Sequence, residues 1–344
     1  MATARVTRHR VNMDDVARHA QVSTATVSRA LRGMPGVSEG TRARILEVAE
    51  ELDYVISPEA SRLSRGATGR VALVVPRLDL WFYATIAASI DAELALAQLD
   101  VLLYQVDGEQ QRRRFFDELP ARRKVDAVVL AALPLLEREV ERLDLLGVHV
   151  VVAGGRVRDY PFVRVDDRAV AEDAVDHLVS LGHTRIAMLR TDDTEGAIWS
   201  SDAERVEGFR RAMARHRLRL PRNHVITVPF GPAAGREAAT RLLALDPLPT
   251  GVFAYCDEIA FGALQHLNRA GVDVPGQVSM VGVDNHPFAE TAGLSTYDQA
   301  IEEQGRLAGQ AVIALLKGHQ PDASLHAVAT RFIDRGSTAP PPAS

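Results

Sequence analysis

Residues 13–31 read MDDVARHAQVSTATVSRAL, and this stretch decides how the N-terminal part of the chain folds. It holds two short helical patterns separated only by Ala20-Gln21-Val22. Helices this short are not stable alone in water, so the two must pack against each other. Asn12, with Asp15 three residues later, forms an N-cap pattern for the first helix. Ser23 provides a second N-cap.

The apolar residues of this region are spaced so that they share one inner face. The second helix is predicted over Thr24–Leu31, and a third, capped by Ser38, over Thr41–Leu52. The inward residues of the three helices are Val16, Ala17, Ala20, Val22, Val27, Leu31, Ile45, Val48, Ala49 and Leu52. Thr24, Ala25, Ser28 and Arg29 are left on the outer face of the second helix.

A short helix, a tight turn and an exposed second helix with a small polar N-terminal face are typical of helix-turn-helix DNA recognition. Thr24 and Ala25 can pack on thymine methyl groups, and Arg29 can reach guanine or a phosphate. The alternative is a plain three-helix module that contacts no DNA.

The charge is distributed unevenly over the 344 residues. The net charge is -5, but residues 1–70 carry eleven arginines against eight acids. A basic head on an acidic body indicates an anionic partner for the head, although a chance fluctuation explains an excess of three charges equally well.

Cys256 is the only cysteine, which excludes an intrachain disulfide. No leader and no apolar run near the ~18 residues of a membrane span is present, so a soluble, cytoplasmic protein with no membrane partner is expected.

From Val71 onward, short aliphatic runs alternate with longer amphipathic stretches. This alternation predicts parallel sheets covered by helices on both faces. Predicted strands are 71–75, 101–104, 127–130, 148–152, 186–189, 251–253 and 279–283; predicted helices include Phe82–Ala97, Asp167–Leu181, Ser201–Arg215 and Asp257–Ala270. The number of units favours two lobes. Ligands of such sheets bind beyond the carboxyl ends of the strands, so a cleft between the lobes is expected.

Signatures of enzymes are missing from the sequence. It has no G-x-x-x-x-G-K-[ST], no G-x-G-x-x-G opening a helix, no H-E-x-x-H and no G-x-S-x-G, and its only lysines are Lys124 and Lys317. The pairs Asp166-Asp167 and Asp192-Asp193 could suggest a metal, but adjacent acids at such junctions usually cap helices. We expect no catalytic residue, no metal site and no cofactor.

Residues 11–54 strongly resemble the headpiece of the lactose-repressor (LacI) family of bacterial transcription regulators. The elements DVA, VSTATVSR, VS-x-x-TR and ELDY fall at the family's spacings. The resemblance continues more loosely to about residue 334. It implies an all-α helix-turn-helix headpiece joined to an α/β, two-lobed sensor similar to periplasmic binding proteins.

The resemblance also implies which residues bind DNA. They are Thr24, Ala25, Thr26, Ser28 and Arg29 on the second helix and Ala60 and Leu63 in the hinge. In this family the hinge folds in the minor groove of the operator when two protomers meet. A leucine then wedges into a central base step, as in other minor-groove binders. The sequence departs from the usual Pro-Asn entry with Ile56-Ser57-Pro58, yet proline suits a first helical turn.

The effector site implied by the resemblance combines aromatic and charged side chains. The residues are Trp81, Phe82, Trp199, Arg205, Phe230, Cys256, Asp257 and Asp284. Aromatic faces can stack on sugars, while arginine and carboxylates hold hydroxyls. Each aromatic can equally be core, and Asp167 and Asp257 can be helix caps. The charges of Arg205 and Asp284 are expected to be solvated in an empty cleft and unnecessary for the fold.

The expected organisation follows from these assignments. The headpiece covers 1–56, the hinge and linker 57–70, and the sensor 71–334. Its N-lobe is about 71–163 and 295–321, its C-lobe about 164–294 and 322–334, and a disordered tail covers 335–344. The function expected is an allosteric repressor, homodimeric, cytoplasmic and nucleoid-associated. It would bind a pseudopalindromic double-stranded operator and a carbohydrate effector. One alternative is a solute-binding module with a helical head that binds no DNA. Another keeps the fold but makes the effector a corepressor, or makes the protein an activator.

Overall fold

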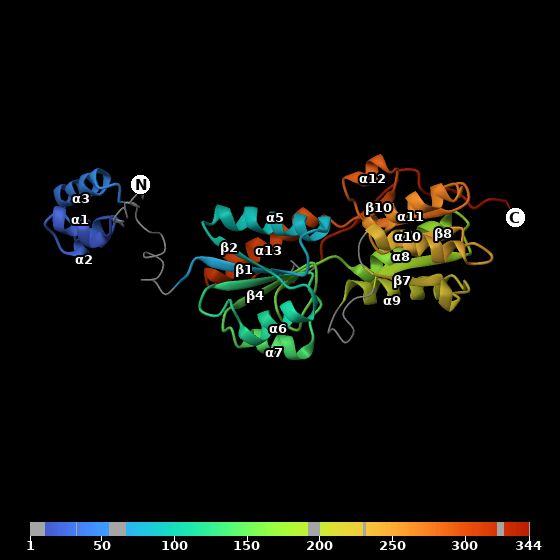
Figure 1. Ribbon diagram of the computed structural model, residues 1–344, viewed down its shortest axis with the longest axis horizontal. Coiled ribbons are helices and arrows are strands. Elements are labelled where there is room, and N and C mark those ends of the chain that lie inside the picture. The colour runs from blue at the N-terminus through green and yellow to red at the C-terminus, as the bar shows by residue number, and fades with distance from the viewer. Residues whose placement is uncertain are drawn as a thin grey trace, which may run out of the picture. The chain divides into compact units, whose positions relative to one another are not determined.

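The computed structural model describes residues 11–31, 33–54, 67–191, 200–229, 232–321 and 327–343. The chain divides into two compact units, residues 1–68 and 69–344, which are described separately (Figure 1). Of the predicted hinge, residues 57–66 lie outside the described residues, and Arg70 begins the first strand of the second unit.

The first unit contains three helices, α1 (Met13–His19), α2 (Thr24–Leu31) and α3 (Glu39–Glu51). Their predicted caps are confirmed. Asn12 Oδ1 accepts from the Asp15 amide at 3.1 Å, and the Asn12 amide donates to Asp15 Oδ2 at 3.0 Å. Ser23 Oγ accepts from the Thr26 amide at 3.1 Å, and Ser38 Oγ from the Thr41 amide at 3.3 Å. Helix α3 begins directly after Ser38, two residues earlier than predicted.

A small core holds the three helices together. Its fully buried members are Val16, Ala17, Ala20, Val27, Ala30, Ile45 and Ala49. Leu31, Val22, Val48 and Leu52 pack around it and are half-buried. The helical spacing therefore predicted this core, and the polar residues of α2 are left on its surface.

The first lobe of the sensor unit is a parallel sheet with the strand order β2-β1-β3-β4-β5. The strands are β1 (Arg70–Val75), β2 (Asp100–Gln105), β3 (Ala127–Ala131), β4 (His149–Ala153) and β5 (Phe162–Val163). Helices α5 (Trp81–Leu96) and α13 (Ile301–Leu316) cover one face; α6 (Gly108–Glu118) and α7 (Glu137–Asp144) cover the other (Figure 1).

The second lobe is a sheet with the order β11-β10-β9-β8-β6-β7, parallel except for β11. Its strands are β6 (Ile186–Thr191), β7 (Val225–Val228), β8 (Gly251–Ala254), β9 (Ser279–Asp284), β10 (Ser295–Asp298) and β11 (Arg331–Ile333). Helices α8 (Asp167–Ser180) and α9 (Ser201–Arg215) pack on one face; α10 (Pro232–Leu243) and α11 (Asp257–Arg269) pack on the other. A short 3-10 helix, Arg222–His224, precedes β7, and α12 (Phe288–Thr291) follows β9.

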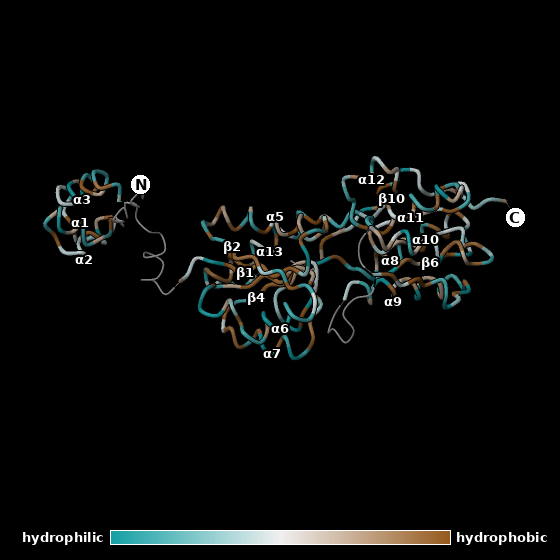
Figure 2. Tube along the Cα trace, viewed as in Figure 1, coloured by the Kyte–Doolittle hydropathy of each residue, from teal (hydrophilic) through white to brown (hydrophobic). Residues whose placement is uncertain are grey.

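The predicted strands are all present, and their apolar composition reflects burial on both faces. Strand β3 is fully buried along its length, as are β8 and β9. Figure 2 shows hydrophobic residues along the strands of both lobes, between helices that carry the hydrophilic residues. Among the described residues, no helix is both long enough and apolar enough to span a bilayer.

Neighbouring helices approach closely at glycines. A Cβ at Gly208 of α9 would lie 2.2 Å from the Arg168 carbonyl oxygen of α8. A Cβ at Gly235 of α10 would lie 2.1 Å from the Ile259 carbonyl oxygen of α11. Only glycine permits such backbone contact, so each of these helix pairs packs backbone against backbone.

The lobe boundaries differ from the prediction at one point. Strand β10, residues 295–298, pairs with β9 and β11 in the second sheet, whereas the N-lobe was expected to resume at 295. The chain returns to the first lobe only after Asp298, through α13. It crosses again to reach β11, where Arg164 and Ala327 form an isolated parallel bridge between two crossing segments.

The prediction of a disordered tail over 335–344 is wrong for its first part. The Met280 amide donates to the Ser337 carbonyl at 2.8 Å, and the Ser279 hydroxyl donates to the Ala339 carbonyl at 2.9 Å. Ser337 is buried. The proline-rich composition suggested disorder, but the segment supplies backbone partners for the end of the second sheet.

Candidate functional site

A polar cavity lies where the carboxyl ends of both sheets meet. Ala132 and Gly154 follow β3 and β4 of the first lobe. In the second lobe, Tyr255 follows β8 and Asp284 ends β9. This is the position expected for the ligand of an open α/β sheet. The lining residues are Phe82, Tyr83, Ala132, Gly154, Val165, Asp167, Ser201, Arg205, Tyr255, Cys256, Asp284, Gln299 and Gln304.

The cavity is small, with a volume of about 40 Å³. Since one water molecule needs roughly 10–15 Å³ measured in this way, there is room for a few waters and not for a sugar. The lobes are therefore closed on each other in this structure, and a carbohydrate enters only if they separate.

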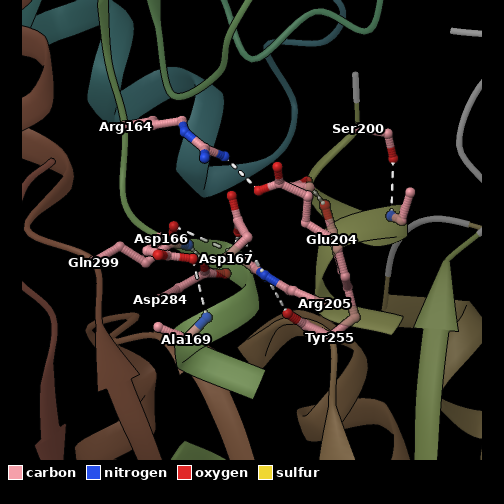
Figure 3. A network of polar contacts seen from close by, with 12 residues as sticks. Arg164, Asp166, Asp167, Ala169, Ser200, Glu204, Arg205, Tyr255, Asp284 and Gln299 are labelled. Atoms are coloured by element: carbon pink, nitrogen blue, oxygen red, sulfur yellow. Dashed lines mark hydrogen bonds and ion pairs between the residues drawn. The ribbon is translucent and has the colours of Figure 1, made fainter. Parts of the chain in front are cut away.

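Arg205 of α9 is the centre of the polar network (Figure 3). Its side chain is 4% exposed. Nε donates to Asp167 Oδ1 at 2.8 Å, one terminal nitrogen donates to the Tyr255 carbonyl, and the other donates to Gln299 Oε1 at 3.3 Å. The guanidinium also lies over the Tyr255 ring, 4.6 Å from its centroid.

The expectation that the charges of Arg205 and Asp284 are solvated is therefore wrong. Both are buried, and every partner of Arg205 belongs to the second lobe or to the segment that leaves it. A buried guanidinium needs a partner, because an unpaired charge is strongly unfavourable. Asp166 caps α8 through the Ala169 amide at 3.0 Å, which leaves Asp167 free to be that partner.

Burial raises the pKa of two neighbouring carboxyl groups, Asp257 and Asp284. Asp257 accepts on both oxygens, from the Thr296 hydroxyl at 2.7 Å and the His286 amide at 2.9 Å. Asp284 accepts one hydrogen bond, from the Gln299 amide. Like charges in one buried region disfavour double ionisation. The two hydrogen bonds to Asp257 favour its ionised form, so burial and the neighbouring Asp257 raise the pKa of Asp284 the more strongly of the two.

A pH dependence follows for the protein without ligand. Because the folded pKa of Asp284 exceeds its unfolded value, the stability it contributes is complete below about pH 4 and is lost as pH rises toward the folded pKa. The side chain of the Asp284→Asn variant cannot ionise. The free energy of unfolding of this variant should therefore increase relative to that of the parent as the pH rises from 5 to 8. Urea unfolding at both values measures this. Asp159→Asn, at an exposed site, is the control, and a constant difference for Asp284→Asn would contradict the assignment.

The cavity includes only some of the predicted effector residues. Phe82, Arg205, Cys256 and Asp284 line it. Trp199 and Phe230 lie outside the described residues. Trp81 and Asp257 do not line the cavity. Both contact other parts of the sensor unit instead.

Trp81 takes part in a second contact between the lobes. Its amide donates to Glu258 Oε1 of α11 at 3.0 Å, and its ring lies 4.8 Å from the His286 ring between centroids. Asp257 joins α11 to β10 and to the segment after β9, through the two hydrogen bonds described above. These placements explain why an aromatic residue and an acid at strand ends need not face the ligand.

Several lining residues were not identified from the sequence. Tyr83, Ser201, Tyr255, Gln299 and Gln304 all face the cavity. Tyr83 follows the identified Phe82, and Ser201 begins the helix that carries Arg205. The proximity of these two residues to identified site residues could have indicated that they line the cavity. The two glutamines lie where the chain crosses between lobes and carry no motif.

On the headpiece, the predicted recognition residues lie on one helix. Thr24, Ala25 and Arg29 are exposed, and Ser28 is half-buried. Thr26 differs because its hydroxyl lies 2.8 Å from Ser23 Oγ in the cap of α2. Thr26 therefore has a structural contact before any DNA contact.

Comparisons with known proteins match both units. Residues 12–57 match the family described as bacterial regulatory proteins, lacI family, and residues 175–338 match the periplasmic binding protein-like domain. The HTH-type transcriptional regulator DegA of Bacillus subtilis is 30% identical over 298 residues, which cover 85% of this chain and 87% of DegA.

Solved structures are similar over nearly the whole chain. A complex of the transcriptional regulator CelR with cellobiose has 28% identity and a TM-score of 0.69, and the match covers 95% of this chain and 100% of that one. The Lac repressor dimer bound to operator and the anti-inducer ONPF has 20% identity and a TM-score of 0.82, over 96% of this chain and 100% of that one. The latter likeness concerns the fold alone.

Proposed function

Because this chain belongs to the LacI family of bacterial regulatory proteins, we propose that it is a DNA-binding repressor controlled by a small molecule between its lobes. It is a transcription regulator and not an enzyme. The observation that carries the proposal is the combination in one chain of an exposed recognition helix, α2, with a polar cavity at the facing strand ends.

The ligand of the cavity is proposed to be a carbohydrate, as in the CelR complex with cellobiose. A ligand changes DNA affinity only as far as it binds one state better than the other. The closed cavity is too small for a sugar, so ligand binding favours a different angle between the lobes. Its place of action is proposed to be the nucleoid.

The test of this function begins with selection of duplex sequences from a random library by the full chain. Selected DNA should contain two related half-sites, and its affinity should fall steeply as salt rises, because bound phosphates release counterions. The alternative, a solute-binding module whose head binds no DNA, predicts no enrichment. The names of the relatives compared above describe transcription regulators and do not favour it.

We propose that Thr24, Ala25 and Arg29 contact base edges, with Ser28 and Thr26 at the margin. Exchanging Thr24 and Ala25 for other small residues should change which bases are preferred. Each altered contact should shift discrimination by roughly 1–3 kcal/mol. Repeating the selection with the variants measures this. An unchanged preference, with Asp14→Asn in α1 as a matched control, would show that α2 is not the reading helix.

Ala60 and Leu63 lie outside the described residues. Their proposed role, folding against the minor groove with Leu63 as the wedge, is supported by the family alone.

Binding to two half-sites requires a homodimer, and exposed apolar side chains support the proposal that the protein forms a homodimer. Leu96 is 82% exposed and Phe288 67% exposed. Phe288 borders a groove of about 1030 Å³ along α11 and α12.

A further inference from the structure

The donors of Arg205 are already committed to protein groups. All three of its nitrogens have partners, namely Asp167, the Tyr255 carbonyl and Gln299. None of these partners lies on the first lobe's helices, so separation of the lobes does not release the guanidinium. The usual group for binding an anionic ligand is therefore occupied.

The acceptors of the cavity are, by contrast, under-used. The amide of Gln299 has only one chemically sensible orientation, with Oε1 toward Arg205 and Nε2 toward Asp284. Asp284 consequently receives a hydrogen bond from a neutral amide on Oδ1. Within the described part of the chain, its Oδ2 has no hydrogen bond, and no cation is paired with its carboxyl group.

Gln304 provides a second acceptor. Its Nε2 donates to the Gln299 carbonyl at 2.8 Å, which fixes the orientation of the amide, because a carbonyl can only accept. Gln304 is 1% exposed, and its Oε1 is buried without any hydrogen-bond partner among the described residues. A buried acceptor left unpaired is unfavourable, and this one lines the cavity.

The charges around the cavity, like its hydrogen bonds, favour a ligand that donates hydrogen bonds and carries a positive charge. Asp167, Asp257 and Asp284 are buried, and Arg205, which pairs with Asp167, is the one buried arginine or lysine of the residues that the structure describes. A ligand that brings a further negative charge would face the carboxyl group of Asp284, while the guanidinium of Arg205 is already paired with Asp167. A ligand that brings a positive charge would supply the partner that Asp284 lacks.

We propose that the effector of this cavity carries a protonated amine on a hydroxyl-bearing skeleton, as an amino sugar does, with the amine bound to Asp284 and a hydroxyl donating to Gln304 Oε1. This deepens the proposed function, because it rests on the cavity being the effector site. Sugar phosphates and sugar acids are excluded. Neutral sugars bind more weakly than their amino counterparts.

Binding of the amine has a measurable proton signature. Burial raises the pKa of Asp284, so its proton must leave when the ammonium group arrives. The amine then binds with net release of protons, whereas a neutral sugar releases none. Calorimetry at one pH in buffers of different ionisation enthalpy distinguishes the two.

The test uses matched triplets: glucosamine, glucose and glucose 6-phosphate, and the same three forms of galactose and mannose. The full chain is titrated with each compound. In any triplet with a binder, the amine should bind at least about tenfold more tightly than the neutral sugar, as expected for a hydrogen bond to a charged group. The phosphate should not bind. A phosphate or neutral sugar that binds best, or the failure of every amine at 20 mM, overturns the inference.

Variants separate charge from hydrogen bonding. Asp284→Asn should remove at least about tenfold of the amine affinity and change that for the neutral sugar less than threefold. Gln304→Met should weaken both alike. Asp159→Asn is the matched control. Duplex selection with the same preparations tests the proposed function independently: DNA binding without amine preference overturns this inference alone, and amine binding without DNA binding overturns the regulatory function alone.

Discussion

Arg205→Ala should lower the free energy of unfolding of the sensor unit by about 3–5 kcal/mol, the usual result of breaking a buried ion pair from one side. The substitution leaves the Asp167 carboxylate, 2% exposed, without its cation. It also leaves the Tyr255 carbonyl and Gln299 Oε1 without a donor. Both tryptophans of the chain lie between residues 69 and 344. Urea unfolding followed by tryptophan fluorescence therefore measures this unit alone.

A matched control and a rescue make that result specific. Arg113 forms an exposed pair with Glu109, so Arg113→Ala should change stability by no more than about 0.5 kcal/mol. Adding Asp167→Asn to Arg205→Ala removes the unpaired charge and should recover part of the loss. A loss below about 1 kcal/mol for Arg205→Ala would mean that the guanidinium is available to the ligand, which would also weaken the argument for an amine.

Ile45→Ala should weaken DNA binding strongly while leaving the sensor intact. Ile45 is fully buried at the centre of the headpiece core. Truncating a buried isoleucine costs about 2–5 kcal/mol. A core of this size rarely supplies more than about 3–5 kcal/mol in total, so most headpieces would be unfolded. Affinity for selected duplex DNA should fall by at least roughly tenfold, and tryptophan-detected unfolding of the sensor should be unchanged.

The neighbouring residue provides the control for this prediction. Leu46 lies on the same helix but is 48% exposed, so Leu46→Ala should alter headpiece stability by only about 0.5 kcal/mol. DNA binding should then be close to that of the parent. If Ile45→Ala bound DNA normally, or if it also lowered the stability of the sensor, the headpiece would not be the independent unit described here.

The headpiece could be predicted almost completely from the sequence. Its determinants are local: Asn12, Ser23 and Ser38 cap helices within three residues of themselves, and the inner stripe repeats at helical spacing. The aliphatic strands of the lobes were also predictable, because burial on both faces demands continuous apolar runs. Strand β10, STYD, has no such run, and its place in the second sheet depends on pairing with β9 and β11.

The site could be predicted only in part. The family resemblance pointed to Arg205 and Asp284, and both line the cavity. It could not show that Arg205 is paired with Asp167, which lies 38 positions earlier. Gln299 and Gln304 acquire their importance from one crossing between lobes, where Gln299 lies between Arg205 and Asp284. Such contacts are determined by the tertiary fold, and no local sequence pattern predicts them.

The path of the chain between the lobes also determines how chimeric regulators can be built. The peptide passes from the first sheet to the second after β5, returns before α13, and passes again before β11. No single splice point can therefore exchange one lobe between two homologues, because each lobe is made of separated segments. The headpiece, in contrast, joins the sensor once. A hybrid with new operator specificity needs one junction, near residue 68, whereas a hybrid with a new ligand should receive residues 69–344 as one block.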